Sequence, residues 1–144
     1  MKKTLFDLLA DLAPGQFRQL LKVSRQDSAT SPTAITRENK QLDDLYFILD
    51  GNLSIEKGGQ RAPSESRTFI GEIAFLLSRP ATATVILEPG SVYFVWNANA
   101  LHRLLRAKPA LNNALSAVMN KKLAQKVANA GVLMNTIGLD YRAP

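Results

Sequence analysis

The spacing of apolar residues changes twice along this chain of 144 residues, and these changes limit the folds that it can adopt. Near the N-terminus, Leu5, Leu8, Leu9 and Leu12 recur at the three- and four-residue spacing of an amphipathic helix. Between about residues 33 and 97 the spacing becomes that of strands, and from about residue 98 it is helical again. Helix, β-block and helix in this order predict an α+β fold.

The middle of the chain alternates strand patterns with turn signals. Residues 45–49 are rich in strand formers, and Asp50-Gly51 after them predicts a hairpin turn to a strand that ends at Gly58-Gly59. Residues 84–87 predict another strand, and Pro89-Gly90 predicts a turn. Two polar segments, 24–34 and 58–68, predict loops, the first with a poor edge strand as the alternative.

On the strand that follows Pro89-Gly90, Val92, Phe94 and Trp96 are expected to share one face, as core or pocket wall.

The helical parts carry their own start and stop signals. Pro14-Gly15 ends the first helix before a second short one, and Asn97 or Asn99 is expected to cap a helix over the next turns. Pro109 predicts the first residue of a longer helix, and Gly131 predicts its end. One apolar stripe runs along this longer helix: Leu111, Leu115, Val118, Met119, Leu123 and Val127.

Charge and composition narrow the function. The net charge is +6, and residues 98–144, with seven Lys or Arg and only Asp140, carry the excess. We interpret this charge as a solvated helix face; the alternative is an acidic surface bound by Lys121, Lys122 and Lys126. With no Cys and a single His, the chain has too few ligands for a metal-dependent cupin; we interpret His102, between Leu101 and Arg103 on a predicted helix, as a polar helix position and not as the His of a Ser-His-Asp hydrolase, so we expect no enzyme.

The same composition bears on location. No stretch approaches the roughly 20 apolar residues of a membrane span, and acidic residues interrupt any signal peptide. The absence of cysteine fits a reducing compartment, so we expect a cytoplasmic protein.

The segment from Phe69 to Val85 carries the chemistry. Gly71 lets the backbone approach a ligand closely, and residues 72–77 can form one short helical turn. The N-terminus of such a turn offers N–H donors that suit an anion such as phosphate. Glu72 at this position can accept hydrogen bonds from sugar hydroxyls.

This order of residues resembles the phosphate-binding cassette of the cyclic nucleotide-binding domain family, to which the catabolite activator protein and the regulatory subunits of protein kinase A belong. The resemblance spans roughly residues 35–128 and includes the upstream block 45–51 and two downstream helices. It implies an antiparallel β-roll (a double-stranded β-helix or jelly roll) with N-terminal helices and two C-terminal helices. The chain is only loosely similar to bacterial Popeye-like domains, whose Asp-Ser-Pro-Glu signature it lacks.

The resemblance implies a ligand, cAMP or cGMP, and no other cofactor or metal. The residues that it places at the ligand are Ile70, Gly71, Glu72, Ile73, Ala74, Arg79, Ala81, Thr82 and Ala83. One of them departs from the family, since Ala81 stands where the family has the arginine that grips the cyclic phosphate. We expect cyclic nucleotide binding to be weak or absent, unless Arg79 turns in to replace that arginine.

The resemblance also sets the expected organisation and two competing functions. We expect one domain over 1–144, with helices over about 4–22, a β-roll over about 33–97, C-terminal helices over about 98–130 and a tail over 131–144. One function is a regulatory sensor module. The other is a degenerate fold that serves in dimerisation or protein contact, with homodimers formed through the helix Pro109–Ala130, or that is the soluble part of a membrane protein. About 14 residues follow this helix, too few for a DNA-reading module.

Overall fold

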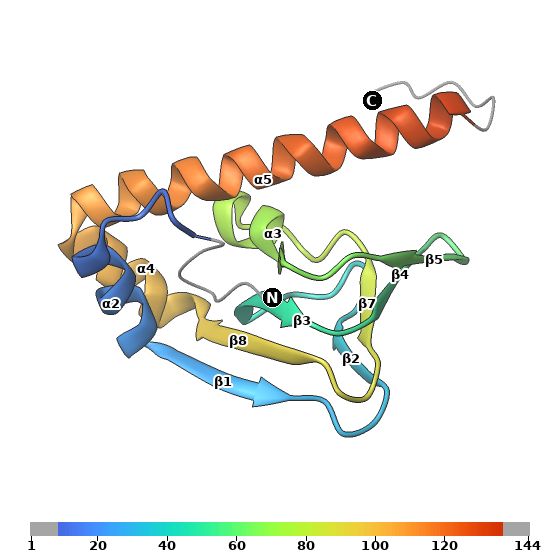
Figure 1. The fold of residues 1–144 in the computed structure, drawn as a ribbon, viewed down its shortest axis with the longest axis horizontal. Helices are drawn as coiled ribbons and strands as arrows, with labels where there is room; N and C mark the ends of the chain where they lie inside the picture. Colours follow the sequence, from blue (N-terminus) through green and yellow to red (C-terminus); the bar gives the residue numbers. More distant parts are fainter. Residues whose placement is uncertain (1–8, 137–144) are drawn as a thin grey trace.

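A computed structural model describes residues 9–136, with side chains placed up to Lys126 and again at Ala128. Helices from both ends of the chain pack at one end and along one side of a block of strands (Figure 1). In chain order the elements are α2 (Pro14–Lys22), β1 (Ser24–Ser28), β2 (Thr33–Thr36), β3 (Asp44–Asp50), β4 (Leu53–Lys57), β5 (Gln60–Ser64), β6 (Thr68–Ile70), α3 (Glu72–Leu77), β7 (Thr84–Leu87), β8 (Val92–Asn97), α4 (Ala98–Ala107) and α5 (Pro109–Thr136).

The strands form two four-stranded antiparallel sheets that face each other as a roll. One sheet has the order β1-β8-β3-β6 and the other has the order β2-β7-β4-β5. Apart from β4 and β5, strands that follow each other directly along the chain lie in opposite sheets. The predicted α+β fold, an antiparallel β-roll flanked by helices, is therefore confirmed.

The turn at Asp50-Gly51 carries the chain from one sheet to the other. We predicted a hairpin here, and that prediction is wrong, because β3 pairs with β6 and β8 whereas β4 pairs with β5 and β7. Gly51 has a φ of 121°, and a Cβ built on it would lie 2.4 Å from Ser91 Oγ. The turn therefore needs glycine both for its backbone angle and for the close approach to Ser91.

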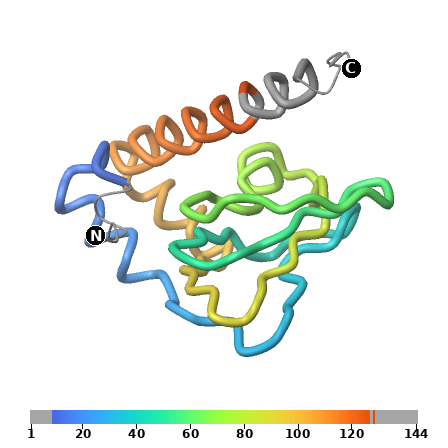
Figure 2. Tube along the Cα trace, turned by 45° about the vertical axis from the view of Figure 1, so that its right-hand side comes forward, coloured from blue at the N-terminus to red at the C-terminus, as the bar shows by residue number. Residues whose placement is uncertain are grey.

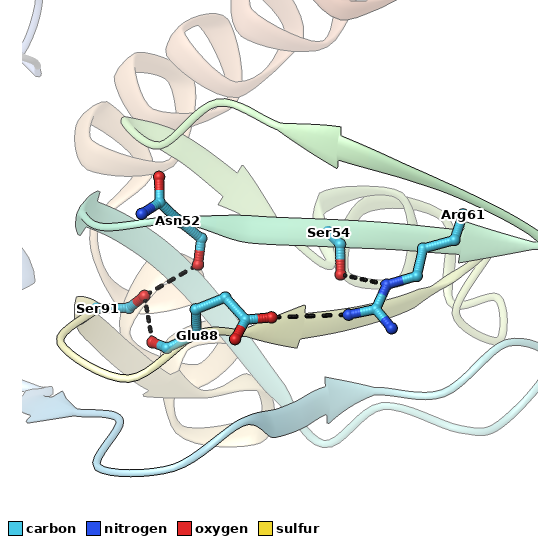
Figure 3. Close-up of polar contacts among 5 residues, drawn as sticks. All are labelled: Asn52, Ser54, Arg61, Glu88 and Ser91. Atoms are coloured by element: carbon cyan, nitrogen blue, oxygen red, sulfur yellow. Dashed lines mark hydrogen bonds and ion pairs between the residues drawn. The ribbon is translucent and has the colours of Figure 1, made fainter.

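Polar contacts join this corner to the turn between β7 and β8 (Figure 3). The Oγ of the fully buried Ser91 lies 2.7 Å from the carbonyl oxygen of Glu88 and 3.1 Å from that of Asn52. Arg61 on β5 donates from Nε to Ser54 Oγ at 3.1 Å, and its Nη2 lies 3.6 Å from Glu88 Oε1. These contacts hold β4, β5 and the end of β7 in register.

Two polar segments that we predicted as loops contain strands. Residues 58–68 include β5, which pairs with β4 through a two-residue Gly58-Gly59 turn, and both glycines have positive φ. Such a turn is the preferred connection of a hairpin. Residues 24–34 include β1, which pairs only with β8 at the edge of its sheet, so the alternative of an edge strand was the correct one.

The two central strands of the first sheet, β3 and β8, carry buried side chains on both faces. Their inward side chains join the cluster inside the roll, which contains Ile48, Leu53, Ile70, Val85, Leu87, Tyr93 and Val95. Their outward side chains, among them Leu45, Phe47 and Trp96, pack against the helices. Trp96 is therefore core rather than pocket wall, and its Nε1 donates to the carbonyl oxygen of Leu20 at 2.9 Å.

The helices α2, α4 and the first turns of α5 gather at one end of the roll (Figures 1 and 2). Asn97 caps α4 as predicted, because its side chain accepts a hydrogen bond from the Ala100 N–H. Pro109 is the first residue of α5, also as predicted. Of the predicted first helix, residues 4–8 lie outside the described residues, and 9–12 form a turn that buries Leu9 and Leu12.

The helix α5 extends further than we predicted. It passes through Gly131 and ends at Thr136, so the predicted tail over 131–144 is wrong up to residue 136, and the rest lies outside the described residues. An isolated glycine costs a helix only about 1 kcal/mol, which neighbouring turns can offset. The stripe on α5 packs on the chain's own core, where Leu111, Leu115, Val118 and Met119 are buried.

Candidate ligand-binding site

Gly71 begins the segment that the sequence singled out. It follows β6 directly and forms the N-cap of α3, the short helix that we predicted over residues 72–77. Its φ of 91° is in the left-handed region, and a Cβ built on it would lie 2.4 Å from Leu42 Cδ2. Only glycine therefore fits this corner without displacing Leu42.

Glu72, the first residue of α3, is buried and bound by a lysine from the C-terminal helix. Its side chain is 7% exposed, and its Oε1 lies 2.6 Å from Lys126 Nζ. The same ammonium donates to the Phe69 carbonyl oxygen at 2.5 Å. Figure 1 shows how this is arranged, since α5 passes over α3. The carboxylate that we expected to face a sugar is therefore held by the chain itself.

A cavity of about 240 Å³ lies beside this ion pair. Eight of the nine predicted ligand residues line it, namely Ile70, Gly71, Glu72, Ile73, Ala74, Ala81, Thr82 and Ala83. Six residues that the sequence analysis did not assign to the ligand complete the wall: Thr36, Ile55, Lys57, Val85, Leu123 and Lys126. The structure thus brings the two predicted halves of the cassette together, while their role in binding stays a prediction.

The wall opposite α3 is fixed by hydrogen bonds to the segment after β2. The Ala81 N–H donates to the Lys40 carbonyl oxygen at 2.9 Å, and the Ala81 carbonyl oxygen accepts from the Asn39 N–H at 2.8 Å. The Thr36 hydroxyl donates to the Ala83 carbonyl oxygen and accepts from the Val85 N–H. Ala81 is 6% exposed and lines the cavity; that it stands at the position of the family's arginine stays a prediction from the resemblance.

Arg79 does not line this cavity. It lies in the wall of a second one, of about 410 Å³, on the other side of α3. His102 of α4 lines the same second cavity, and its ring stacks on that of Phe75 with centroids 4.0 Å apart. Burial, and then the charge of Arg106, lower the pKa of His102. Arg79 therefore does not replace the missing guanidinium in this structure.

The basic residues of α5 each contact the chain's own side chains. Lys121 Nζ lies 3.7 Å from Asp11 Oδ2, Lys122 Nζ lies 5.9 Å from the centroid of the Phe47 ring, and Lys126 is bound to Glu72. These contacts do not test the alternative in which the three lysines bind an acidic surface, and it stays a prediction. No local signal in the sequence distinguished Lys126 from the other two.

Residues 9–136 contain neither a cluster of metal ligands nor a helix that could span a membrane. In this part of the chain no group of three or more His, Asp or Glu is placed to hold a metal ion. No helix there is both long enough and apolar enough to cross a membrane.

The comparisons with known proteins agree with this geometry. The family profile of the cyclic nucleotide-binding domain matches residues 28–108, more than half of the chain. The chain belongs to the cyclic nucleotide-binding domain family. The matched part contains both halves of the cassette but ends before α5, so Lys126 lies outside it. A search of curated proteins gave no match.

Solved structures of cyclic nucleotide-binding domains and related regulators share the fold. A cyclic nucleotide-binding domain from Methylobacillus flagellatus KT is 19% identical with a TM-score of 0.80, over 99% of this chain and 81% of that one. The catabolite activator protein of Thermus thermophilus is 17% identical with a TM-score of 0.67, over 88% of this chain and 62% of that one.

The sensor domain of the transcriptional regulator DNR from Pseudomonas aeruginosa is 22% identical with a TM-score of 0.59, over 84% of this chain and 83% of that one. At these identities the similarity shows the fold alone and does not show the function.

Proposed function

We propose that this chain is a regulatory sensor module of the cyclic nucleotide-binding domain family in which binding of cAMP or cGMP is weak or absent. The observation that carries the proposal is the state of the cassette's two polar anchors. Ala81 offers only a methyl group, and the Glu72 carboxylate is bound by Lys126. A nucleotide entering this cavity would meet neither a guanidinium for its phosphate nor a free carboxylate for its ribose.

The absence of the arginine should by itself greatly lower the affinity for a cyclic nucleotide. Removing one partner of a buried charge pair costs about 2–5 kcal/mol, which is roughly a 30- to several-thousand-fold loss of affinity. Arg is also difficult to replace by Lys, because the guanidinium binds phosphate through two parallel hydrogen bonds. Lys126 supplies a charge near the cavity, but its ammonium donates hydrogen bonds to two protein oxygens, the Phe69 carbonyl oxygen and Glu72 Oε1.

The size of the cavity supports the same proposal. Small-molecule sites usually occupy about 300–1,000 Å³. The cavity here, at about 240 Å³, is smaller, and Leu123 and Lys126 of α5 form part of its wall. A ligand as large as a cyclic nucleotide would require this part of α5 to move. We therefore propose that ligand and α5 position are coupled, as a shift of population between two helix positions.

Restoring the arginine tests the proposal directly. We expect cAMP and cGMP to bind the wild type weakly or not at all in isothermal titration, and to bind the Ala81→Arg variant measurably. Ala81→Lys is the matched control, because it adds a charge without the forked geometry, and it should gain less. Micromolar cAMP binding by the wild type would contradict the proposal. If Ala81→Arg also fails to bind cAMP and cGMP, the cavity cannot hold a nucleotide even with the arginine present, which would contradict this account of the site.

A second candidate function is dimerisation through α5, in the absence of a small ligand. The buried stripe of α5 is used by its own domain, but Ala117, Ala124 and Ala128 are exposed on the helix and permit close approach of a second copy. Sedimentation velocity of the wild type and of Ala124→Glu tests this function, with Asn112→Glu as a control elsewhere on the helix. A monomer at all concentrations would exclude it.

We propose no catalytic role for this chain, which is supported by the regulatory character of its family. A cytoplasmic location, alone or behind a membrane segment, stays a prediction from composition.

A further inference from the structure

The walls of the cassette cavity are mainly aliphatic. The side chains that form them come from both sheets, from α3 and from α5, and include Ile55, Ile70, Ile73, Val85 and Leu123. The hydroxyl of Thr36, also in the wall, is already used in hydrogen bonds to the backbone. A purine and a ribose would leave several polar groups unpaired against such walls, at a cost of about 1–3 kcal/mol each. An apolar body fits them without this cost.

Two cationic side chains, Lys57 and Lys126, and one carboxylate, Glu72, line this cavity. Lys126 has three N–H donors and gives one to Glu72 Oε1 and one to the Phe69 carbonyl oxygen, so one remains. Lys57, at the exposed end of β4, lines the same cavity, and its ammonium has no ion-pair or hydrogen-bond partner among residues 9–136. Once Glu72 is counted against Lys126, one positive charge is left over.

We propose that this cavity binds a small amphipathic monoanion, a carboxylate on an apolar body, in place of a cyclic nucleotide. The carboxylate would lie between the ammonium groups of Lys57 and Lys126, and the apolar body would lie against the aliphatic walls. Lys126 then has two tasks, because it satisfies the buried Glu72 and gives its remaining donor to the ligand. This inference rests on the proposed sensor function and names the ligand class for the same site.

The probes are hexanoate and phenylacetate, with neutral hexanamide as the matched uncharged compound. Binding is followed by NMR chemical shifts, in which the methyl groups of Ile55, Ile70 and Ile73 report whether the probe enters the cavity. We expect saturable shifts with the carboxylates and at least about tenfold weaker binding of hexanamide, since a hydrogen bond to a charged group is at stake.

Three variants test the two cations. Lys57→Met changes an exposed side chain at a strand end and should keep the fold, so it tests the inference even if Lys126→Met is unstable. Lys57→Met and Lys126→Met should each weaken hexanoate binding about tenfold. Lys121→Met, on the same helix but outside the cavity, is the control and should leave binding unchanged.

Each other outcome has a distinct meaning. Equal binding of hexanoate and hexanamide would overturn the assignment of the charged group. A wild type that binds neither carboxylate would overturn the inference altogether. Titration of Ala81→Arg with cAMP then distinguishes failure of the ligand class alone from failure of the proposed sensor function. If that variant binds cAMP, the sensor function stands and only the ligand class is wrong, whereas no binding of any probe would remove both.

Discussion

Replacing Lys126 with methionine should destabilise the protein far more than the same change at Lys121. Both lysines lie on α5, and both form an ion pair with a carboxylate. They differ in what surrounds the pair. Lys121 and Asp11 have side chains that are 67% and 68% exposed, whereas the Glu72 side chain is 7% exposed and that of Lys126 is 36% exposed. Removing Lys126 therefore leaves a buried carboxylate without its partner.

The size of the effect follows from this difference. Exposed ion pairs contribute about 0–1 kcal/mol, and breaking a buried pair costs about 3–5 kcal/mol. Because Lys126 is partly exposed, we expect a cost of about 2 kcal/mol for Lys126→Met. For a chain of this length that is a decrease in Tm of roughly 4–8 °C. Lys121→Met should change the free energy of unfolding by less than about 0.5 kcal/mol.

The assay is urea denaturation followed by the fluorescence of Trp96. This is the only tryptophan, and it is buried with its Nε1 bound to the Leu20 carbonyl oxygen, so unfolding should change its emission. The double variant Glu72→Gln/Lys126→Met removes both charges and should recover most of the loss. Equal costs for Lys126→Met and Lys121→Met, or no recovery in the double variant, would refute the reasoning.

Three further predictions use the same denaturation assay. Gly71→Ala should cost about 1–3 kcal/mol and more than Gly90→Ala, because both glycines have φ near 90° but only Gly71 lies against another side chain. The pKa of His102 is lowered in the folded chain, so as the pH falls the unfolded chain binds a proton at this position before the folded chain does. The free energy of unfolding should therefore decrease below about pH 6.5, and this decrease should be smaller in His102→Phe. Burial, and then Asp44, raise the pKa of Tyr46 to about 12, so stability should fall as pH rises above 10, and less so in Tyr46→Phe. Equal costs for the two glycine changes, or unaltered pH profiles in the two ring variants, would contradict these expectations.

The elements that could be predicted from the sequence are those with a local physical signal. Gly71 and Glu72 mark the start of α3, Asn97 caps α4, and Pro109 begins α5. The strands β1 and β5 are polar and largely exposed, so they have no apolar alternation; β1 was predicted only as an alternative to a loop, and β5 was missed. Their place in the sheets depends on backbone pairing with β8 and β4, which side-chain patterns do not encode.

The residues of the candidate site also differ in whether a local sequence signal predicts them. Its predicted residues lie within one stretch, 70–83, and a local motif can therefore bring most of them to the same cavity. Lys126 is 54 residues away from Glu72 in sequence and belongs to a basic stretch that resembled a solvated helix face. Only the packing of α5 on α3 selects Lys126 from that stretch, and such packing depends on the whole fold.

The pairing of β1 with β8 has a consequence for how the chain is made. The first strand of the roll has the last strand as its only partner, so during synthesis its backbone groups stay unpaired until residues 92–97 have left the ribosome. The β4–β5 pair, by contrast, closes over two residues and can form early. We therefore expect folding to start at this central hairpin and to finish when the first and last strands of the chain pair and close the roll, in milliseconds to seconds as is usual for such non-local topologies.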